Sequence, residues 1–174
     1  MDCDKTVLIT GASTGIGLAI ARALCETEYR VVLTARPSSL ARFDAHAVTE
    51  SDRVRIRPLD VTDAEQREAL VAEAERDWGG IDVLINNAGV SYRAVVEHVV
   101  EAERLAQMDV NFRSPMEMIR LVLPGMREKR AGRIITISSV GGMMAMPTMA
   151  AYSASKFALE GAHEALWYEV RPWG

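Results

Sequence analysis

Short apolar runs alternate along the chain with longer stretches in which apolar residues recur every three or four positions. The first two runs, Thr6–Thr10 and Val31–Ala35, are rich in β-branched residues and show little polar alternation, which is typical of strands buried on both faces of a sheet. Strands are therefore predicted at Thr6–Thr10, Val31–Ala35, Val54–Leu59, Val83–Ile85 and Ile134–Ile137.

The stretches between these runs have the apolar spacing of amphipathic helices. Thr62-Asp63-Ala64-Glu65 has the spacing of a capping box and marks a helix start. The pattern around Phe43 is a weaker helical signal, and Pro124 is expected to kink its helix. The predicted helices, with their inward residues, are Ile16–Glu28 (Ile16, Ile20, Ala23, Leu24), one following Thr62 (Leu70, Ala74, Trp78), about Asn111 to Lys129 (Met118, Ile119, Val122, Met126) and Tyr152–Val170 (Leu159, Ala162, Leu166).

Strands that alternate with helices indicate an α/β fold with a doubly wound parallel sheet and right-handed crossovers. With 174 residues, 49% of them hydrophobic, the chain fits a single domain over residues 1–174. In such sheets ligands bind outside the carboxyl ends of the strands. Gly11, Asn87 and Ser139 directly follow three of the predicted strands, so the sequence places the site there.

Charge and composition give no indication of a nucleic acid, metal ion or membrane as a partner. The net charge of −4 comes from 20 basic and 24 acidic residues that are interspersed, so no nucleic-acid surface is predicted. Cys3 and Cys25, like His46, His98 and His163, lack the spacing of metal ligands, and no metal is expected. The sequence shows neither the features of a signal peptide nor an apolar run near the ~20 residues that span a bilayer. A cytoplasmic protein without a membrane partner is expected.

A glycine-rich turn, Thr10 to Gly17 (TGASTGIG), joins the first predicted strand to the first helix. A diphosphate can lie there against the free N–H groups of the helix N-terminus, and glycine allows its close approach. The spacing is G-x-x-x-G-x-G, which differs from the common G-x-G-x-x-G pattern. Taken alone, the turn could also be a simple strand-to-helix connection.

Tyr152 and Lys156 are four residues apart at the start of a predicted helix, so their side chains share one face. A free phenol ionises only near pH ~10, and a neighbouring ammonium favours the phenolate. Tyr152 could then act as a general acid in ketone reduction and as a base in alcohol oxidation. From spacing alone, an ordinary exposed pair is the alternative.

Together and in this order, these motifs resemble those of the short-chain dehydrogenase/reductase family. Asn86-Asn87-Ala88-Gly89 resembles the motif after its fourth strand, Asp60-Val61 its adenine contact, and Tyr152-x-x-x-Lys156 its active-site helix. The similarity covers essentially the whole sequence and implies a Rossmann-type domain that binds NAD(P). The predicted cofactor-binding residues are Gly11, Ser13, Thr14, Gly15, Ile16, Gly17, Arg36, Asp60, Val61, Asn87, Ala88, Gly89, Tyr152 and Lys156.

The resemblance also assigns the catalytic roles. It selects Ser139, thirteen positions before Tyr152, as the hydroxyl that hydrogen-bonds the reacting oxygen. Asn111 resembles the asparagine that holds a water in the proton relay, although it could also cap a helix. Lys156 should hydrogen-bond the nicotinamide ribose as well. The predicted catalytic set is Asn111, Ser139, Tyr152 and Lys156, while the cofactor supplies the hydride.

The end of the second predicted strand indicates which cofactor is used. An acidic residue there would accept hydrogen bonds from the ribose 2′-hydroxyl of NAD, but Ala35 stands where NAD-preferring members of the family carry aspartate. The guanidinium of Arg36 can pair with a 2′-phosphate. NADP is therefore predicted over NAD, with NAD left open and a merely solvated Arg36 as the alternative.

The leading hypothesis is an oxidoreductase that interconverts a carbonyl and an alcohol with NADP(H). Met143, Met144, Met146 and Met149 precede Tyr152 and hint at an apolar substrate, although core filling would explain them nearly as well. An epimerase or dehydratase on the same fold, and a cofactor-binding regulator or scaffold without turnover, are the alternatives. The resemblance implies a homodimer or homotetramer.

The number of strands suggests that the fold continues beyond the sequence. A sheet of this type runs 3-2-1-4-5-6, and only five strands are predicted. The carboxyl-terminal strands are thus expected to be missing, since Val170–Gly174 resembles the family's lead-in to the sixth strand. Ile134–Ile137 would then be an apolar sheet edge without protecting charges.

Overall fold

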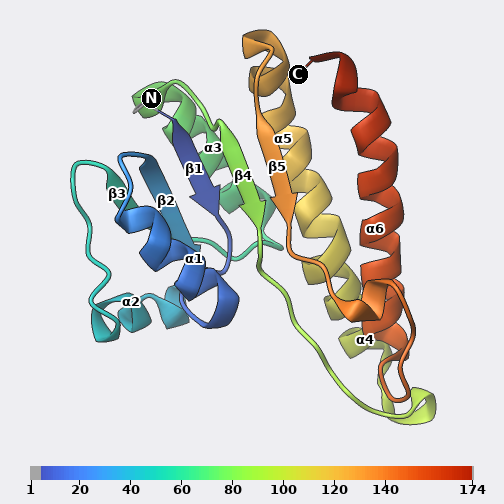
Figure 1. The fold of residues 1–174 in the computed structure, drawn as a ribbon. Helices are drawn as coiled ribbons and strands as arrows, with labels where there is room; N and C mark the ends of the chain where they lie inside the picture. Colours follow the sequence, from blue (N-terminus) through green and yellow to red (C-terminus); the bar gives the residue numbers. More distant parts are fainter. Residues whose placement is uncertain (1–4, 174) are drawn as a thin grey trace.

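In the computed structural model, which describes residues 5–173, five strands form one parallel sheet in the order β3-β2-β1-β4-β5 (Figure 1). Cys3 lies outside the described residues. This order confirms the predicted doubly wound α/β sheet, in which β1 pairs with both β2 and β4. The strands are β1 (Thr6–Ile9), β2 (Arg30–Ala35), β3 (Val54–Pro58), β4 (Val83–Asn86) and β5 (Arg133–Thr136).

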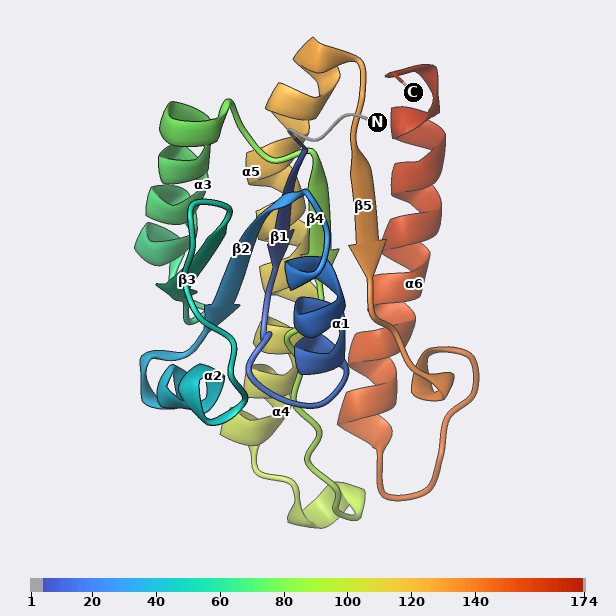
Figure 2. The same ribbon diagram turned by 60° about the vertical axis from the view of Figure 1, so that its left-hand side comes forward.

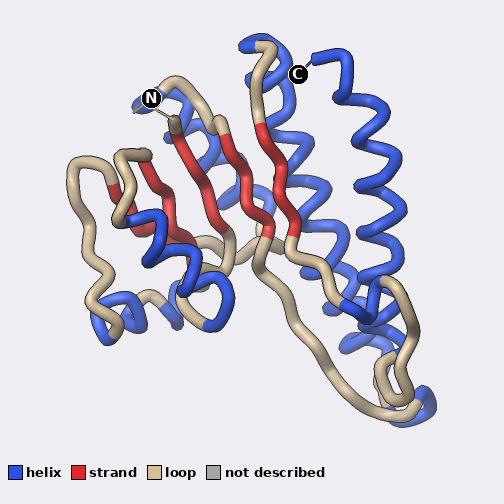
Figure 3. Tube along the Cα trace, viewed as in Figure 1, coloured by secondary structure: helices blue, strands red, loops and turns tan. Residues whose placement is uncertain are grey.

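Helices cover both faces of the sheet (Figures 2 and 3). Because side chains alternate along a strand, Leu8 and Leu84 join one core cluster with α3, α5 and α6, whereas Ile9 and Leu33 join another with α1 and α2. The helices are α1 (Gly15–Cys25), α2 (Ala41–Ala45), α3 (Ala64–Trp78), α4 (Glu101–Met108), α5 (Ser114–Lys129) and α6 (Ala150–Val170).

The inward face of α1 differs from the prediction. Gly17, Leu18 and Ala21 are buried, whereas Ile16 is 61% exposed and Ala23 is exposed. The first turn of the helix packs Gly17 closely against Gly11 and Asn87, in the turns after β1 and β4, whereas the bulky Ile16 is exposed and lines a cleft. The predicted stripe is therefore wrong at Ile16 and Ala23.

The helical region before β5 begins at Glu101, ten residues earlier than the predicted start at Asn111. A five-residue π-helical segment, Asp109–Arg113, joins α4 to α5, so Asn111 lies inside the helical region and does not cap it. Pro124 lies within α5, which continues to Lys129. The inward residues predicted for α5, Met118, Ile119, Val122 and Met126, are all buried.

The start of α3 is also shifted. Asp63 is its N-cap and accepts a hydrogen bond from the Gln66 backbone N–H at 3.1 Å, so the capping pair lies one residue later than predicted. The Gln66 amide donates back to the Asp63 carboxylate at 2.8 Å. Leu70 and Ala74 are buried, as predicted for the inward face of this helix.

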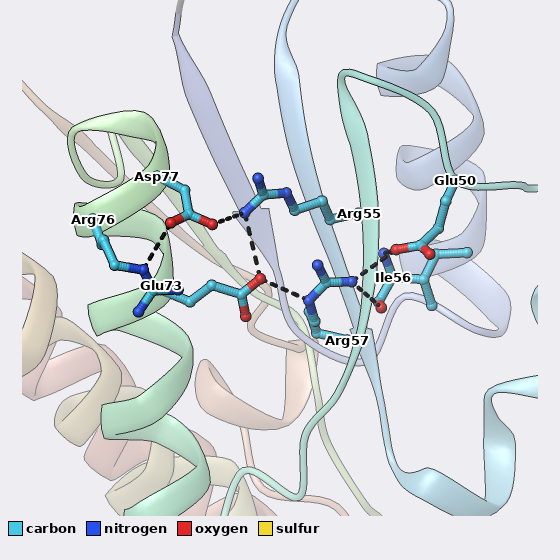
Figure 4. Close-up of polar contacts among 7 residues, drawn as sticks. All are labelled: Glu50, Arg55, Ile56, Arg57, Glu73, Arg76 and Asp77. Carbon is cyan, nitrogen blue, oxygen red and sulfur yellow. Dashed lines mark hydrogen bonds and ion pairs between the residues drawn. The ribbon is translucent and has the colours of Figure 1, made fainter.

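The two edge strands of the sheet, β3 and β5, differ in the contacts that cover them. At β3, the Ile56 N–H donates to the Glu50 carboxylate, and Arg57 bridges Glu50 to Glu73 on α3 (Figure 4). Arg55 lies beside Arg57 and pairs with Asp77. Such charged cover protects an edge strand from pairing with other chains. β5 is the other edge of the described sheet, as predicted, and Ile135 on it is 39% exposed.

Candidate active site

The carboxyl ends of the strands open on one cleft of about 670 Å³. It runs from the turn after β1, past the ends of β2, β3 and β4, to the start of α6. Four predicted site residues, Gly15, Gly17, Asn111 and Ser139, do not line this cleft. The predicted site residues that do line it are Gly11, Ser13, Thr14, Ile16, Arg36, Asp60, Val61, Asn87, Ala88, Gly89, Tyr152 and Lys156.

The turn after β1 is held against the segment after β4. Asn87 donates its side-chain N–H groups to the backbone carbonyls of Thr10 and Gly11, each at 2.9 Å. The Thr10 hydroxyl accepts the backbone N–H groups of Asn87 and Ala88 at 3.0 and 3.1 Å. Asn87 therefore acts first as a brace for the glycine-rich turn, a role that its motif alone did not reveal.

Glycine is required in this turn for two reasons. Gly11 has a φ of +66°, a left-handed conformation that favours glycine, and a β-carbon there would lie 2.9 Å from the Ala88 Cα. Thr14, the N-cap of α1, makes no side-chain cap hydrogen bond, so the helix N-terminus is left to other acceptors. An open helix N-terminus beside a close-packed glycine turn is suited to a phosphate group.

A carboxylate and two arginines lie in the part of the cleft that follows β2 and β3. The hydroxyl and backbone N–H of Thr62 donate to Asp60 at 2.7 and 3.0 Å. The backbone hydrogen bond, followed by the hydroxyl and the positive charge of Arg36, lowers the pKa of Asp60 below its usual value, so the group is ionised at neutral pH. Arg36 and Arg42 line the same end.

Lys156 is 5% exposed, and its ammonium donates to the Ile137 carbonyl at 2.9 Å. Burial lowers the pKa of Lys156 below its usual value, although Glu160 opposes this effect. The structure thus holds the ammonium of Lys156 beside the residue that follows β5. Tyr152, four residues earlier on α6, is half-buried in the same cleft.

Tyr152 and Ser139 flank a single glycine. A β-carbon added at Gly141 would lie 3.0 Å from Tyr152 Cε1 and 3.5 Å from Ser139 Oγ. The Ser139 hydroxyl accepts the Gly141 N–H at 3.0 Å, which fixes the turn that approaches the tyrosine ring. Ser138, its neighbour, lines the cleft instead.

Asn111 braces the start of α6 from within the helical region. It is 1% exposed, accepts the Val90 N–H and donates to the Val90 carbonyl, both at 2.9 Å. It also donates to the Ser155 hydroxyl at 3.1 Å, which in turn donates to the Tyr152 carbonyl at 2.7 Å. Gln107, which sequence reasoning missed, accepts the Tyr92 N–H at 3.1 Å. A buried amide on a polar helix gives no sequence signal of such a role.

Residues 5–173 contain no cluster of three or more His, Cys, Asp or Glu side chains that could hold a metal ion. None of the helices within this range has the length and apolar character needed to cross a membrane.

Known proteins are similar to this chain in sequence. The family model for short chain dehydrogenase matches residues 5–174. A 3-ketodihydrosphingosine reductase from Bacteroides thetaiotaomicron is 41% identical over 168 residues, which are 97% of this chain and 59% of that protein. A D-beta-hydroxybutyrate dehydrogenase from Cupriavidus necator is 34% identical over 158 residues, 90% of this chain and 61% of that protein.

Solved structures agree with these relatives. A short-chain dehydrogenase from Streptomyces avermitilis matches with a TM-score of 0.92 and 38% identity, covering 98% of this chain and 63% of that chain. The chain spans about three fifths of the length of the curated relatives described above.

Proposed function

The chain belongs to the short-chain dehydrogenase/reductase family, and on that premise we propose that it transfers a hydride between NADP(H) and a carbonyl or alcohol substrate. The observation that carries this proposal is the position of Tyr152 and Lys156 on one face of α6, in the same cleft as the glycine-rich turn. One end of the cleft suits a diphosphate, and the other holds an acid–base pair. Such a combination is what a nicotinamide-dependent redox reaction requires.

The residues of the cleft fit the nicotinamide cofactor. The glycine-rich turn and the open N-terminus of α1 would hold its diphosphate, since the turn has no room for a side chain at Gly11. Asp60 and Val61 would contact the adenine, and Ala88 and Gly89 would line the path between the two ends. When bound, the cofactor supplies the hydride.

The proton chemistry belongs to the chain's own side chains. Tyr152 would give its phenolic proton to the oxygen of a carbonyl, or take one from an alcohol, and Ser139 would donate a hydrogen bond to that oxygen. The ammonium of Lys156 would favour the phenolate and hydrogen-bond the ribose. Asn111 braces the helix that carries both, and its role in holding a relay water stays a prediction.

NADP is the proposed cofactor because β2 ends at Ala35, where an acidic residue would favour NAD, and Arg36 follows directly. The substrate class is proposed as a small carbonyl or alcohol compound, with an apolar one suggested by the exposed Met143 and Met144 between β5 and α6. Residues 1–174 are proposed to form one NAD(P)-binding domain. A homodimer or homotetramer and a cytoplasmic location stay predictions.

An assay of NADPH oxidation with a panel of carbonyl compounds, using the full-length protein, tests this function. Replacing Tyr152 with phenylalanine (Tyr152→Phe) should lower turnover by about 10²–10⁴-fold while fold and nucleotide binding persist, because only the ionisable oxygen is removed. Lys156→Ala should impair both binding and rate. Parental turnover in Tyr152→Phe would refute the assignment of the proton donor.

The same assay separates the two alternatives. An epimerase or dehydratase would convert substrate without net consumption of NADPH, whereas a regulator or scaffold would bind the nucleotide and turn nothing over. Net oxidation of NADPH coupled to alcohol formation would support the oxidoreductase.

A further inference from the structure

Three polar side chains come from the segment that follows β2. Arg36 directly follows the strand, Ser39 ends a 3₁₀ turn at Pro37–Ser39, and Arg42 lies in α2. The Ser39 N–H donates to the Arg36 carbonyl at 2.8 Å, which closes this turn. All three residues line the same cleft.

The two arginines of this segment, Arg36 and Arg42, have different electrostatic surroundings. Arg36 acts on the carboxylate of Asp60, so part of its charge is already balanced within the cleft. Arg42 makes no ion pair or hydrogen bond with any acidic side chain among residues 5–173. Asp44 is two residues further along α2, a spacing at which helical side chains do not face each other. Arg42 therefore adds a positive charge that no neighbouring acid offsets.

We propose that Arg42, together with Ser39, completes the binding site for the 2′-phosphate of NADP and is a second specificity-determining residue beside Arg36. This inference rests on the proposed preference for NADP. A phosphate monoester carries a charge of about −1.5 to −2 at pH 7 and three acceptor oxygens. Arg36 also interacts with the carboxylate of Asp60, so Arg36 alone would not neutralise the 2′-phosphate. Two arginines and a serine hydroxyl would match both the charge of the phosphate and its acceptor oxygens.

Two nucleotide fragments isolate this site from the catalytic end of the cleft. Adenosine 2′,5′-bisphosphate carries the 2′-phosphate and AMP lacks it, so the ratio of their dissociation constants measures recognition of that group alone. Both would be titrated calorimetrically into the full-length protein and into Arg42→Ala, Arg36→Ala and Arg42→Lys variants. Arg120→Ala is the matched control, because Arg120 is an exposed arginine on α5 that pairs with Glu117 and does not line the cleft.

Wild type should bind the bisphosphate at least tenfold more tightly than AMP. Arg42→Ala should reduce that ratio about tenfold, as expected when one charged hydrogen-bonding partner is lost. Its affinity for AMP should stay within about twofold of wild type, since AMP lacks the 2′-phosphate that Arg42 is proposed to bind. Arg42→Lys should keep part of the preference because it keeps the charge, and Arg120→Ala should keep all of it.

The outcomes distinguish this inference from the function on which it rests. If Arg42→Ala retains the wild-type ratio while Arg36→Ala loses it, the NADP preference stands and the role of Arg42 is overturned. If wild type binds both fragments equally, the NADP preference itself fails and the 2′-phosphate site fails with it. A fall in AMP affinity equal to that of the bisphosphate would also overturn the proposal, because it would show that Arg42 supports the cleft in general.

Discussion

In the glycine-rich turn, an added methyl group would meet the closest neighbouring atoms at Gly17. A β-carbon there would overlap both the side-chain nitrogen of Asn87 and the carbonyl oxygen of Gly11. Neither can simply move aside. The Asn87 amide is held by its bonds to the Thr10 and Gly11 carbonyls, and Gly11 is itself packed against Ala88. Gly17→Ala must therefore break this brace or push α1 away from β4.

The size of the effect follows from these contacts. Overpacking costs about 1–3 kcal/mol, and each of the two Asn87 hydrogen bonds contributes about 0.5–1.5 kcal/mol. The better helix propensity of alanine offsets about 0.5–1 kcal/mol. The free energy of unfolding should thus fall by roughly 3 kcal/mol, and affinity for AMP should weaken because the diphosphate turn is displaced.

Urea denaturation followed by circular dichroism measures this loss, with Gly125→Ala as the matched control. Gly125 lies inside α5, and a β-carbon there would meet nothing within 4 Å. That variant should gain about 0.5–1 kcal/mol and bind AMP normally. If Gly17→Ala were as stable as Gly125→Ala, the close packing of α1 against the Asn87 brace would be wrong.

Two further predictions concern the edges of the sheet. The Ile56 N–H, followed by Arg57, holds the pKa of Glu50 below its usual value, so Glu50 stabilises the fold when ionised and this contribution is lost as the pH falls below about 4. Glu50→Gln should cost less than about 1 kcal/mol at pH 7, because the pair is exposed, and its difference from wild type should shrink in acid denaturation; a constant difference from pH 7 to pH 2 would contradict this. At the opposite edge, Ile135→Lys in the chain ending at Gly174 should reduce association measured by light scattering, since a charge on an exposed strand opposes edge pairing. Unchanged association in Ile135→Lys would show that β5 is not the associating surface.

Most strands were predictable from the sequence because they are compact, largely apolar runs; β3, with two arginines, is the exception. All five were found within one residue of their observed limits, and the sheet order followed from their alternation with helices. The predicted inward face of α1 was less accurate. The close contact of α1 with the turns after β1 and β4 is made by Gly17, which carries no hydrophobic signal, while the apolar Ile16 lines the cleft. α4 was missed because its sequence is mostly polar and only Gln107 is buried.

The two halves of the candidate site differ in how much of them the sequence reveals. The end proposed to bind the nucleotide is built from short turns at strand ends, so its glycines and Arg36 could be proposed from neighbouring residues alone. Arg42 could not, because it lies seven positions beyond the end of β2. It lines the same cleft only because a 3₁₀ turn at Pro37–Ser39 and α2 follow the strand, and the sequence analysis did not predict that turn.

The catalytic end depends instead on hydrogen bonds between residues far apart in sequence. Asn111 reaches Val90 and, 44 residues away, Ser155, so a buried amide in a π-helical segment links the loop after β4 to the first turn of α6. A π-helical segment inserts an extra residue into the helical register and redirects the side chain it carries. The position of Tyr152 relative to the cleft is therefore set partly by the geometry at Asn111. The sequence around Asn111 or Tyr152 gives no sign that the two positions are linked. The spacing of Tyr152 and Lys156 did predict that their side chains share one face of a helix, and both residues line one cleft.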